Sequence, residues 1–318
     1  MSGLRFVDVC AGAGGLALGL EQAGFEPVLL LDRKAVACET LGLNRPHWKV
    51  LEMDLLDFVP DEHPYTYDVD LLSAGLPRLR SSATAARTDT DEEERLLRAT
   101  VLLAPAIQPH AMIIENVPAL VEAAAFAPLR TFVHEELEHL GYRLHWFVLN
   151  AADFGVPQVR KQGVLVALKA RYAKRFRPPP PTVTTHTSAG EALRQSMAAR
   201  GWRGADAWAD GAGAVAPTLV GGSDNRGGAD LGPSGTKAAW ARMGVNGGAL
   251  ADTVPGPEDD GRSDLIKLTD AQTALLQDFP ADWLFSGRKT ARYRQIGHAS
   301  PPPVGKALGL AVAEALSG

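Results

Sequence analysis

Apolar runs of strand length alternate with helix-like patterns over the first half of the chain. The run at residues 6–10 ends in a glycine-rich turn, and leucines at 16, 18 and 20 open a helix. Further strands are predicted at 26–32, 49–53, 67–73, 111–114, 142–150 and 163–168, and helices at 34–43, 93–103, 129–140, 269–276 and 304–316. This alternation predicts an α/β fold with a doubly wound sheet.

The turn Gly12-Ala-Gly14-Gly15 between the first strand and helix is a candidate nucleotide-binding corner. Glycines let the backbone come close to a ligand and leave N–H groups free at the start of a helix. Many α/β proteins carry the same turn as a tight connection without a ligand. This stretch alone therefore leaves both interpretations open.

Carboxylates follow several predicted strands at their carboxyl ends. Asp32 ends the second strand, where doubly wound folds place an acid that accepts hydrogen bonds from ribose hydroxyls. Its alternative role is a cap for the helix that follows. Asp54 follows the third strand, and Glu115 lies at the end of the fifth, where a buried carboxylate is costly without a partner or ligand. Residues 78–92 predict a mobile loop.

Composition places the chain among ordinary globular proteins and changes the picture little. Apolar residues make up 46%, charged residues 22%, and the net charge is −5. No run of residues is long and apolar enough for a membrane span, and the first residues lack the basic and apolar regions that we would expect of a secretory signal. Two cysteines, Cys10 and Cys38, favour a reducing cytoplasm and give no zinc or other metal site.

The composition shifts at the proline-rich segment 175–181, which predicts a semi-rigid linker. Residues 171–263 are slightly basic, and glycines crowd residues 211–248, a composition that favours loops and contact surface over core. We therefore expect an α/β domain interrupted by an inserted module and closed by the helix at 304–316.

In their order, the motifs resemble those of the cytosine-5 DNA methyltransferases. The matching segments are Asp8-Val-Cys-Ala-Gly-Ala-Gly-Gly15, Asp32, Asp54, Gly75-Leu-Pro77, Glu115-Asn-Val117, Gln158-Val-Arg160 and Arg294-Gln-Ile-Gly297 before Pro301-Pro302. The resemblance implies an S-adenosyl-L-methionine-dependent methyltransferase sheet with an inserted, smaller target-recognition domain. The catalytic domain would be residues 1–170 completed by 264–318, and the recognition domain residues 171–263.

The resemblance also implies a cofactor, partners and site residues. S-adenosyl-L-methionine would be held by Asp8, Cys10, Ala11, Gly12, Gly14, Gly15, Asp32, Arg33, Asp54, Leu55, Gly75, His298 and Ala299. The expected partner is double-stranded DNA with a flipped cytosine, and a restriction endonuclease is a candidate second partner. We expect a monomer.

The family's chemistry assigns roles to a cysteine, an acid and an arginine. A thiolate adds to C6 of the flipped base, so that C5 can attack the methyl group. Glu115 matches the acid that contacts N3 and the amino group of the base. Arg160 matches the first arginine of the family's Gln-x-Arg-x-Arg pattern, and in the family an arginine holds O2 of the base. This chain departs from the pattern: Arg78 stands in place of the cysteine, Gln162 in place of the second arginine and His298 in place of an asparagine.

Three interpretations follow from Arg78. In one, the nucleophile has moved to Cys10, because neighbouring strand tips lie about 4.8 Å apart and an arginine lowers a thiol pKa. In another, the protein is a catalytically inactive methyltransferase fold that binds DNA or a partner. In the third, methyl transfer goes to a different acceptor and Arg78 clamps a phosphate or carboxylate. The alternative role for Cys10 is that of a small buried residue that fills space.

Overall fold

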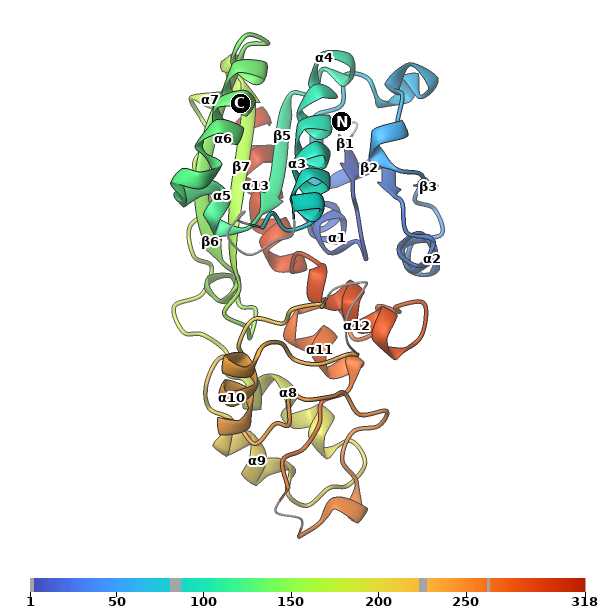
Figure 1. Cartoon of the computed structure of the whole chain (residues 1–318), viewed down its shortest axis with the longest axis vertical. Helices are drawn as coiled ribbons and strands as arrows, with labels where there is room; N and C mark the ends of the chain where they lie inside the picture. Colours follow the sequence, from blue (N-terminus) through green and yellow to red (C-terminus); the bar gives the residue numbers. More distant parts are fainter. Residues whose placement is uncertain (1–2, 81–86, 223–227, 262–263, 318) are drawn as a thin grey trace. The chain divides into compact units, whose positions relative to one another are not determined.

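The computed structural model describes residues 3–80, 87–222, 228–261 and 264–317. It divides into two compact units (Figure 1). We call residues 1–149, 161–180 and 304–318 the sheet unit, and residues 150–160 and 181–303 the insert unit. Residues 264–303 thus group with the insert unit and not with the sheet, because α11 (Asp270–Leu276) packs on α8 (Ala189–Ala198).

A seven-stranded sheet in the order β3-β2-β1-β4-β5-β7-β6 forms the centre of the sheet unit. The strands β1 to β5 pair in parallel, whereas β7 runs antiparallel to β5. This arrangement confirms the predicted doubly wound α/β fold. The strands are β1 (Leu4–Val9), β2 (Phe25–Asp32), β3 (Val50–Glu52), β4 (Leu71–Gly75), β5 (Ala111–Asn116), β6 (Tyr142–Asn150) and β7 (Lys161–Lys169).

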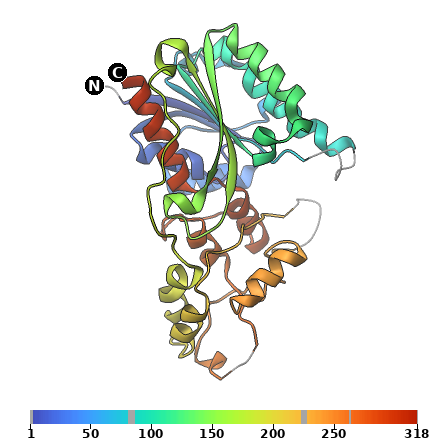
Figure 2. The ribbon, with the colours of Figure 1, turned by 90° about the vertical axis from the view of Figure 1, so that its left-hand side faces the viewer.

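Helices cover both faces of the sheet (Figure 2). On one face, Val7 and Val9 of β1 join a hydrophobic cluster with Leu97 of α3 and Val133 of α6. On the other face α13 packs on α1. The helices of this unit are α1 (Gly15–Gln22), α2 (Ala35–Asn44), α3 (Arg87–Leu102), α4 (Ala104–Ile107), α5 (Pro118–Glu122), α6 (Ala127–Glu138), α7 (Ala170–Ala173) and α13 (Pro302–Ser317). None of the helices described is long and apolar enough to cross a membrane.

The insert unit has its own hydrophobic core. Leu193, Met197, Trp240 and Leu276 are among its buried residues. Besides α8 and α11 it holds α9 (Ala205–Gly211), α10 (Ser234–Arg242) and α12 (Lys289–His298). The glycine-rich stretch 211–248 was predicted to form loops, yet α10 lies within it, because Trp240 anchors a short glycine-poor segment in this core.

Two other boundaries differ from the sequence prediction. The fourth strand was expected from residue 67, but β4 begins at Leu71, because Asp68 adopts a left-handed backbone with φ 51° that a strand does not accommodate. The mobile loop expected at 78–92 is shorter, because α3 already begins at Arg87. Residues 81–86 of that loop lie outside the described part of the chain.

Candidate active site

The turn after β1 adopts a left-handed backbone at three positions. Cys10, Gly12 and Gly14 have φ values of 54°, 55° and 84°. A β-carbon added at Gly12 would meet no heavy atom within 4 Å, so the backbone there faces open space. No side chain caps the start of α1 at Gly14. The turn therefore has open space beside Gly12, and the start of α1 is not covered by a capping side chain. A ligand role for the turn stays a prediction.

The carboxylate of Asp32 braces this turn from the end of β2. One oxygen, Oδ2, accepts a hydrogen bond of 2.8 Å from the backbone N–H of Gly12. The other, Oδ1, accepts one of 2.8 Å from the N–H of Lys34, directly before α2. Asp32 thus fixes the glycine turn and the start of α2 at once. The bond to Lys34 agrees in part with the predicted capping role, and the bond to Gly12 places the carboxylate beside the turn.

Asp54 and Arg33 form a charged cluster at the ends of β3 and β2. Asp54 caps the short helix that begins at Leu55, through a bond of 3.0 Å from the N–H of Leu56. Arg33 lies 3.7 Å from Asp54 and also pairs with Glu92 of α3. The ion pair to Glu92 joins α3 to this edge of the sheet, and no pattern in the sequence predicts this contact.

Asp8 is a fully buried carboxylate on the face of the sheet opposite to Val7 and Val9. Its Oδ1 accepts a hydrogen bond of 2.6 Å from the hydroxyl of Ser73. No donor in the described part of the chain reaches its Oδ2. Burial raises the pKa of Asp8 to about 7. The hydrogen bond from Ser73 lowers this pKa, and the negative charge of Asp32 raises it by a smaller amount.

Cys10 lies in an environment that disfavours a thiolate. Burial raises its pKa well above the usual range, and the carboxylates of Asp32, Asp8 and Asp54 raise it further, in that order. Arg33 is the cation that opposes this rise, and Arg78 does not contribute. The prediction that Arg78 lowers the pKa of Cys10 is therefore wrong, because burial has the largest effect and the charges of three acids raise the pKa further.

The loop that carries Arg78 is held in place by Asn116 at the end of β5. The Asn116 side chain accepts a hydrogen bond of 3.0 Å from the N–H of Leu79 and donates one of 3.0 Å to the carbonyl of Pro77. Both bonds flank Arg78, so the backbone at this position is fixed. Sequence reasoning noted Asn116 only as part of a pattern and missed this positioning role.

Arg78 and Glu115 lie near enough at this strand end for their charges to interact. Glu115 pairs in register with Gly75 of β4 and is 8% exposed, and Arg78 is half-buried. Burial lowers the pKa of Arg78, and the negative charge of Glu115 works against that change. The two opposite charges therefore attract each other at the tips of β4 and β5, and Arg78 occupies the position of the cysteine in the family pattern.

Gln162 lies on the same face of the sheet as Glu115. The register pairs Glu115 with Val164 and Asn116 with Gly163, and side chains two residues apart on a strand share a face. Gln162 is 1% exposed. An uncharged amide thus stands near Glu115 at the position where the family pattern has its second arginine.

Arg160 holds together the backbone of the insert unit. Its guanidinium donates hydrogen bonds of 3.0 and 3.1 Å to the carbonyls of Leu219 and Gly297, and one of 3.4 Å to His298. The side chain is 1% exposed. Three carbonyl contacts give Arg160 a structural role that sequence reasoning missed, since it assigned this residue to the base alone.

His298 and Ala299 also lie in the insert unit. The His298 ring is exposed, and its Nε2 lies 3.0 Å from the carbonyl of Gly222. Ala299 is 8% exposed, and its N–H bonds to Gln295. Of the predicted site residues, the structure thus brings Asp8, Cys10, Ala11, Gly12, Gly14, Gly15, Asp32, Arg33, Asp54, Leu55, Gly75, Arg78 and Glu115 into one unit, and Arg160, His298 and Ala299 into the other.

Comparison with known proteins places this site in a family context. Residues 4–314 match the model of the C-5 cytosine-specific DNA methylases. The chain is 42% identical to the Type II methyltransferase M.NaeI of Lentzea aerocolonigenes, across 100% of this chain and 76% of that protein. It is 38% identical to M.NgoMIV of Neisseria gonorrhoeae, across 98% and 97%. The S. pombe Dnmt2 methyltransferase shares the fold, with a TM-score of 0.65, 17% identity and 99% of each chain covered.

Proposed function

This chain belongs to the C-5 cytosine-specific DNA methylase family, and on that premise we propose a cytosine-5 DNA methyltransferase of the Type II restriction-modification kind with an altered base pocket. It binds the methyl donor and double-stranded DNA. Its methyl transfer is slower by several orders of magnitude than a thiolate-assisted reaction, because loss of a covalent nucleophile has an effect of that size. The observation that carries the proposal is Arg78, which lies between the two residues that Asn116 bonds and whose charge interacts with that of Glu115.

The family's cofactor, S-adenosyl-L-methionine, supplies an electrophilic methyl group when bound. The residues present fit it: Gly12 faces open space, the start of α1 has no side-chain cap, and Asp32 holds the turn in shape. We assign the turn Ala11 to Gly15, with Asp8, Asp32 and Asp54 beside it, to donor binding. Arg33, Leu55, Gly75, His298 and Ala299 remain additional candidates.

In the base pocket, Glu115 is the group that contacts the base. Its carboxylate accepts a hydrogen bond from the amino group of a flipped cytosine, and Arg78 balances its charge. Cys10 takes no part as a nucleophile, because burial and neighbouring acids keep its thiol protonated by raising its pKa. Arg160 acts as a positioning residue that fixes the carbonyls of the insert unit.

We propose residues 171–263, most of which lie in the insert unit, as the target-recognition domain. The insert unit has a hydrophobic core of its own, which supports the loops that would contact DNA. Many of its cations are paired with acids, such as Arg194 with Asp206 and Asp210 and Arg203 with Asp260. We therefore expect contacts between loops and DNA bases to contribute more to DNA binding than a uniform basic surface does. We further propose a monomer that works beside a restriction endonuclease.

Three measurements on the full chain test this proposal together. We expect saturable binding of S-adenosyl-L-methionine by calorimetry, a shift of mixed-sequence duplex DNA in gels, and very little transfer of labelled methyl groups to that DNA. Gly12→Val should weaken donor binding, since a branched side chain at φ 55° is strained. Rapid methylation by the parent chain would contradict the proposal, as would the absence of donor binding.

A second candidate function is a non-catalytic DNA-binding protein. The attraction between Arg78 and Glu115 favours it, because a guanidinium beside the acid provides no nucleophile. The same assays separate the two functions. A chain that binds DNA with no detectable methyl transfer and no measurable affinity for the donor is a binding protein alone.

A further inference from the structure

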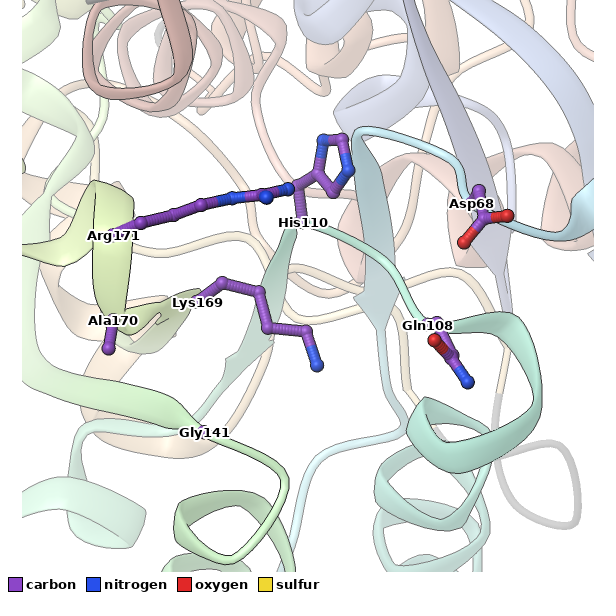
Figure 3. A pocket seen from close by; sticks show the side chains of 7 residues that line it. All are labelled: Asp68, Gln108, His110, Gly141, Lys169, Ala170 and Arg171. Atoms are coloured by element: carbon purple, nitrogen blue, oxygen red, sulfur yellow. The ribbon is translucent and has the colours of Figure 1, made fainter.

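A pocket lies at the end of the sheet away from Glu115 and Asn116. It forms where β4 and β5 begin and β7 ends, since Ala111 at the start of β5 pairs with Leu168 near the end of β7. The pocket has a volume of about 330 Å³, and Asp68, Gln108, His110, Lys169 and Arg171 are among its lining residues (Figure 3). It lies entirely within the sheet unit and shares no residue with the candidate active site.

Lys169 holds a positive charge on one side of this pocket. Its ammonium donates one hydrogen bond of 3.0 Å to the carbonyl of Leu140 and lies 4.1 Å from the centroid of the Tyr142 ring. Burial and the charge of Arg171 both lower its pKa. An ammonium has three donors, so after the bond to Leu140 others remain for a ligand.

Arg171 brings a second positive charge to the same side. Its guanidinium lies 4.6 Å from the centroid of the Tyr172 ring, and that ring lies 5.5 Å from the ring of His110. Among the described residues no carboxylate forms an ion pair with Lys169 or Arg171. The two cations therefore repel each other, and an anion between them would relieve that repulsion.

Hydrogen-bond acceptors lie across the pocket from these cations. Asp68 and Gln108 adopt left-handed backbones with φ of 51° and 52°, and Figure 3 shows both side chains on the other side of His110 from Arg171. The Nδ1 atom of His110 lies 3.2 Å from Oδ1 of Asp70, so this ring is already paired with a carboxylate. Asp68 is the carboxylate that lines the pocket itself.

We propose that this pocket binds a small phosphate ester that carries hydroxyl groups. The phosphate sits between Lys169 and Arg171, because two cations match a dianion better than a carboxylate with a single charge. The hydroxyl groups donate to Asp68. A volume of about 330 Å³ is at the small end for ligand pockets, which fits a sugar phosphate or mononucleotide and not a larger cofactor.

Calorimetry with the full chain and ribose 5-phosphate as the probe tests this proposal. We expect saturable binding, weakened about tenfold or more by Lys169→Met and by Arg171→Gln. Asp68→Asn should weaken ribose 5-phosphate but leave inorganic phosphate unchanged, and asparagine tolerates the left-handed backbone at this position. The matched control is Lys174→Met, an exposed lysine outside the pocket. Thermal melting confirms that each variant is folded.

Three results would overturn the proposal. One is the absence of saturable binding of ribose 5-phosphate to the parent chain. The second is equal affinity in the parent and in the Lys169 and Arg171 variants. The third is displacement of ribose 5-phosphate by duplex DNA, which would assign the two cations to the phosphates of the DNA backbone. None of these results bears on methyl transfer, so the function proposed above is tested separately.

Discussion

At the scale of single residues, Asp8 links burial to pH-dependent stability. Its pKa in the folded chain, about 7, is above the ordinary value of 3.8 that it has when unfolded. Between these two values the unfolded carboxyl loses its proton while the folded one keeps it. The free energy of unfolding therefore falls as pH rises through this window, by up to about 4 kcal/mol in total, and the loss is complete above pH 7.

Asp8→Asn should remove this pH dependence. The amide oxygen can still accept the hydrogen bond from Ser73, and no charge is buried. We expect the variant to be more stable than the parent above pH 7 and similar to it near pH 4, as measured by urea unfolding across that range. Asp57→Asn, at an exposed position, serves as the control. Parallel pH profiles for the parent and Asp8→Asn would contradict this account of Asp8.

Cys10 offers a second test at the residue scale. Because its pKa is raised by burial and by three carboxylates, it should react with iodoacetamide at pH 8 far more slowly than a free thiol. Cys38, for which burial and the charges of Asp32 and Glu52 raise the pKa to about 11, is the internal comparison. Mass spectrometry of peptides, after the folded chain has been labelled for set times and then digested, gives both rates. Alkylation of Cys10 at the rate of a free thiol would restore it as a candidate nucleophile.

At the scale of elements, Asn116 joins the end of β5 to the loop after β4. Asn116→Ala removes two hydrogen bonds that flank Arg78 and leaves the N–H of Leu79 without its acceptor. The expected cost is about 1–3 kcal/mol in the free energy of unfolding. Asn44→Ala, which removes a bond to Thr40 on α2, is the control and should cost less. Equal losses in the two variants would argue that Asn116 does not fix this loop.

The packing of α13 on α1 depends on a glycine at the crossing. A β-carbon at Gly305 would lie 2.9 Å from the carbonyl oxygen of Leu16, so Gly305→Ala should force the helices apart at a cost of about 1–3 kcal/mol. Gly42→Ala on α2 is the matched control, since no atom lies within 4 Å of its added β-carbon. We expect that change to be neutral or stabilising in thermal melts. Tolerance of Gly305→Ala would contradict the close contact.

The elements also show what the sequence can and cannot predict. Buried strands such as β1 and β5 follow from their apolar runs, and the order of residues along the chain is enough to place polar side chains at the ends of these strands. The helix α10 was missed because surrounding glycines hid a short segment that only Trp240 and the second core stabilise. Local pattern does not contain such tertiary contacts.

At the scale of the whole molecule, the sequence predicts which positions form the candidate site, but not which charges and hydrogen bonds surround each of them. The sequence placed Cys10, Asp32 and Glu115 at strand ends, where the structure has them. It could not show that the charges of Asp8, Asp32 and Asp54 all act on Cys10, because this effect depends on three separate strands and on burial. Nor could it show that Arg160 bonds to three backbone carbonyls, the last of them from His298.

The most direct test of the altered base pocket is methyl transfer by Arg78→Cys compared with Arg78→Ser. Both changes remove the guanidinium beside Glu115, and only the first supplies a thiol at the position that Asn116 fixes. We predict that Arg78→Cys raises the rate of labelled methyl incorporation into mixed-sequence DNA by about a thousandfold or more, whereas Arg78→Ser does not. Equal rates in the two variants, or a parent already as fast as Arg78→Cys, would contradict the claim that the missing thiolate limits this chain.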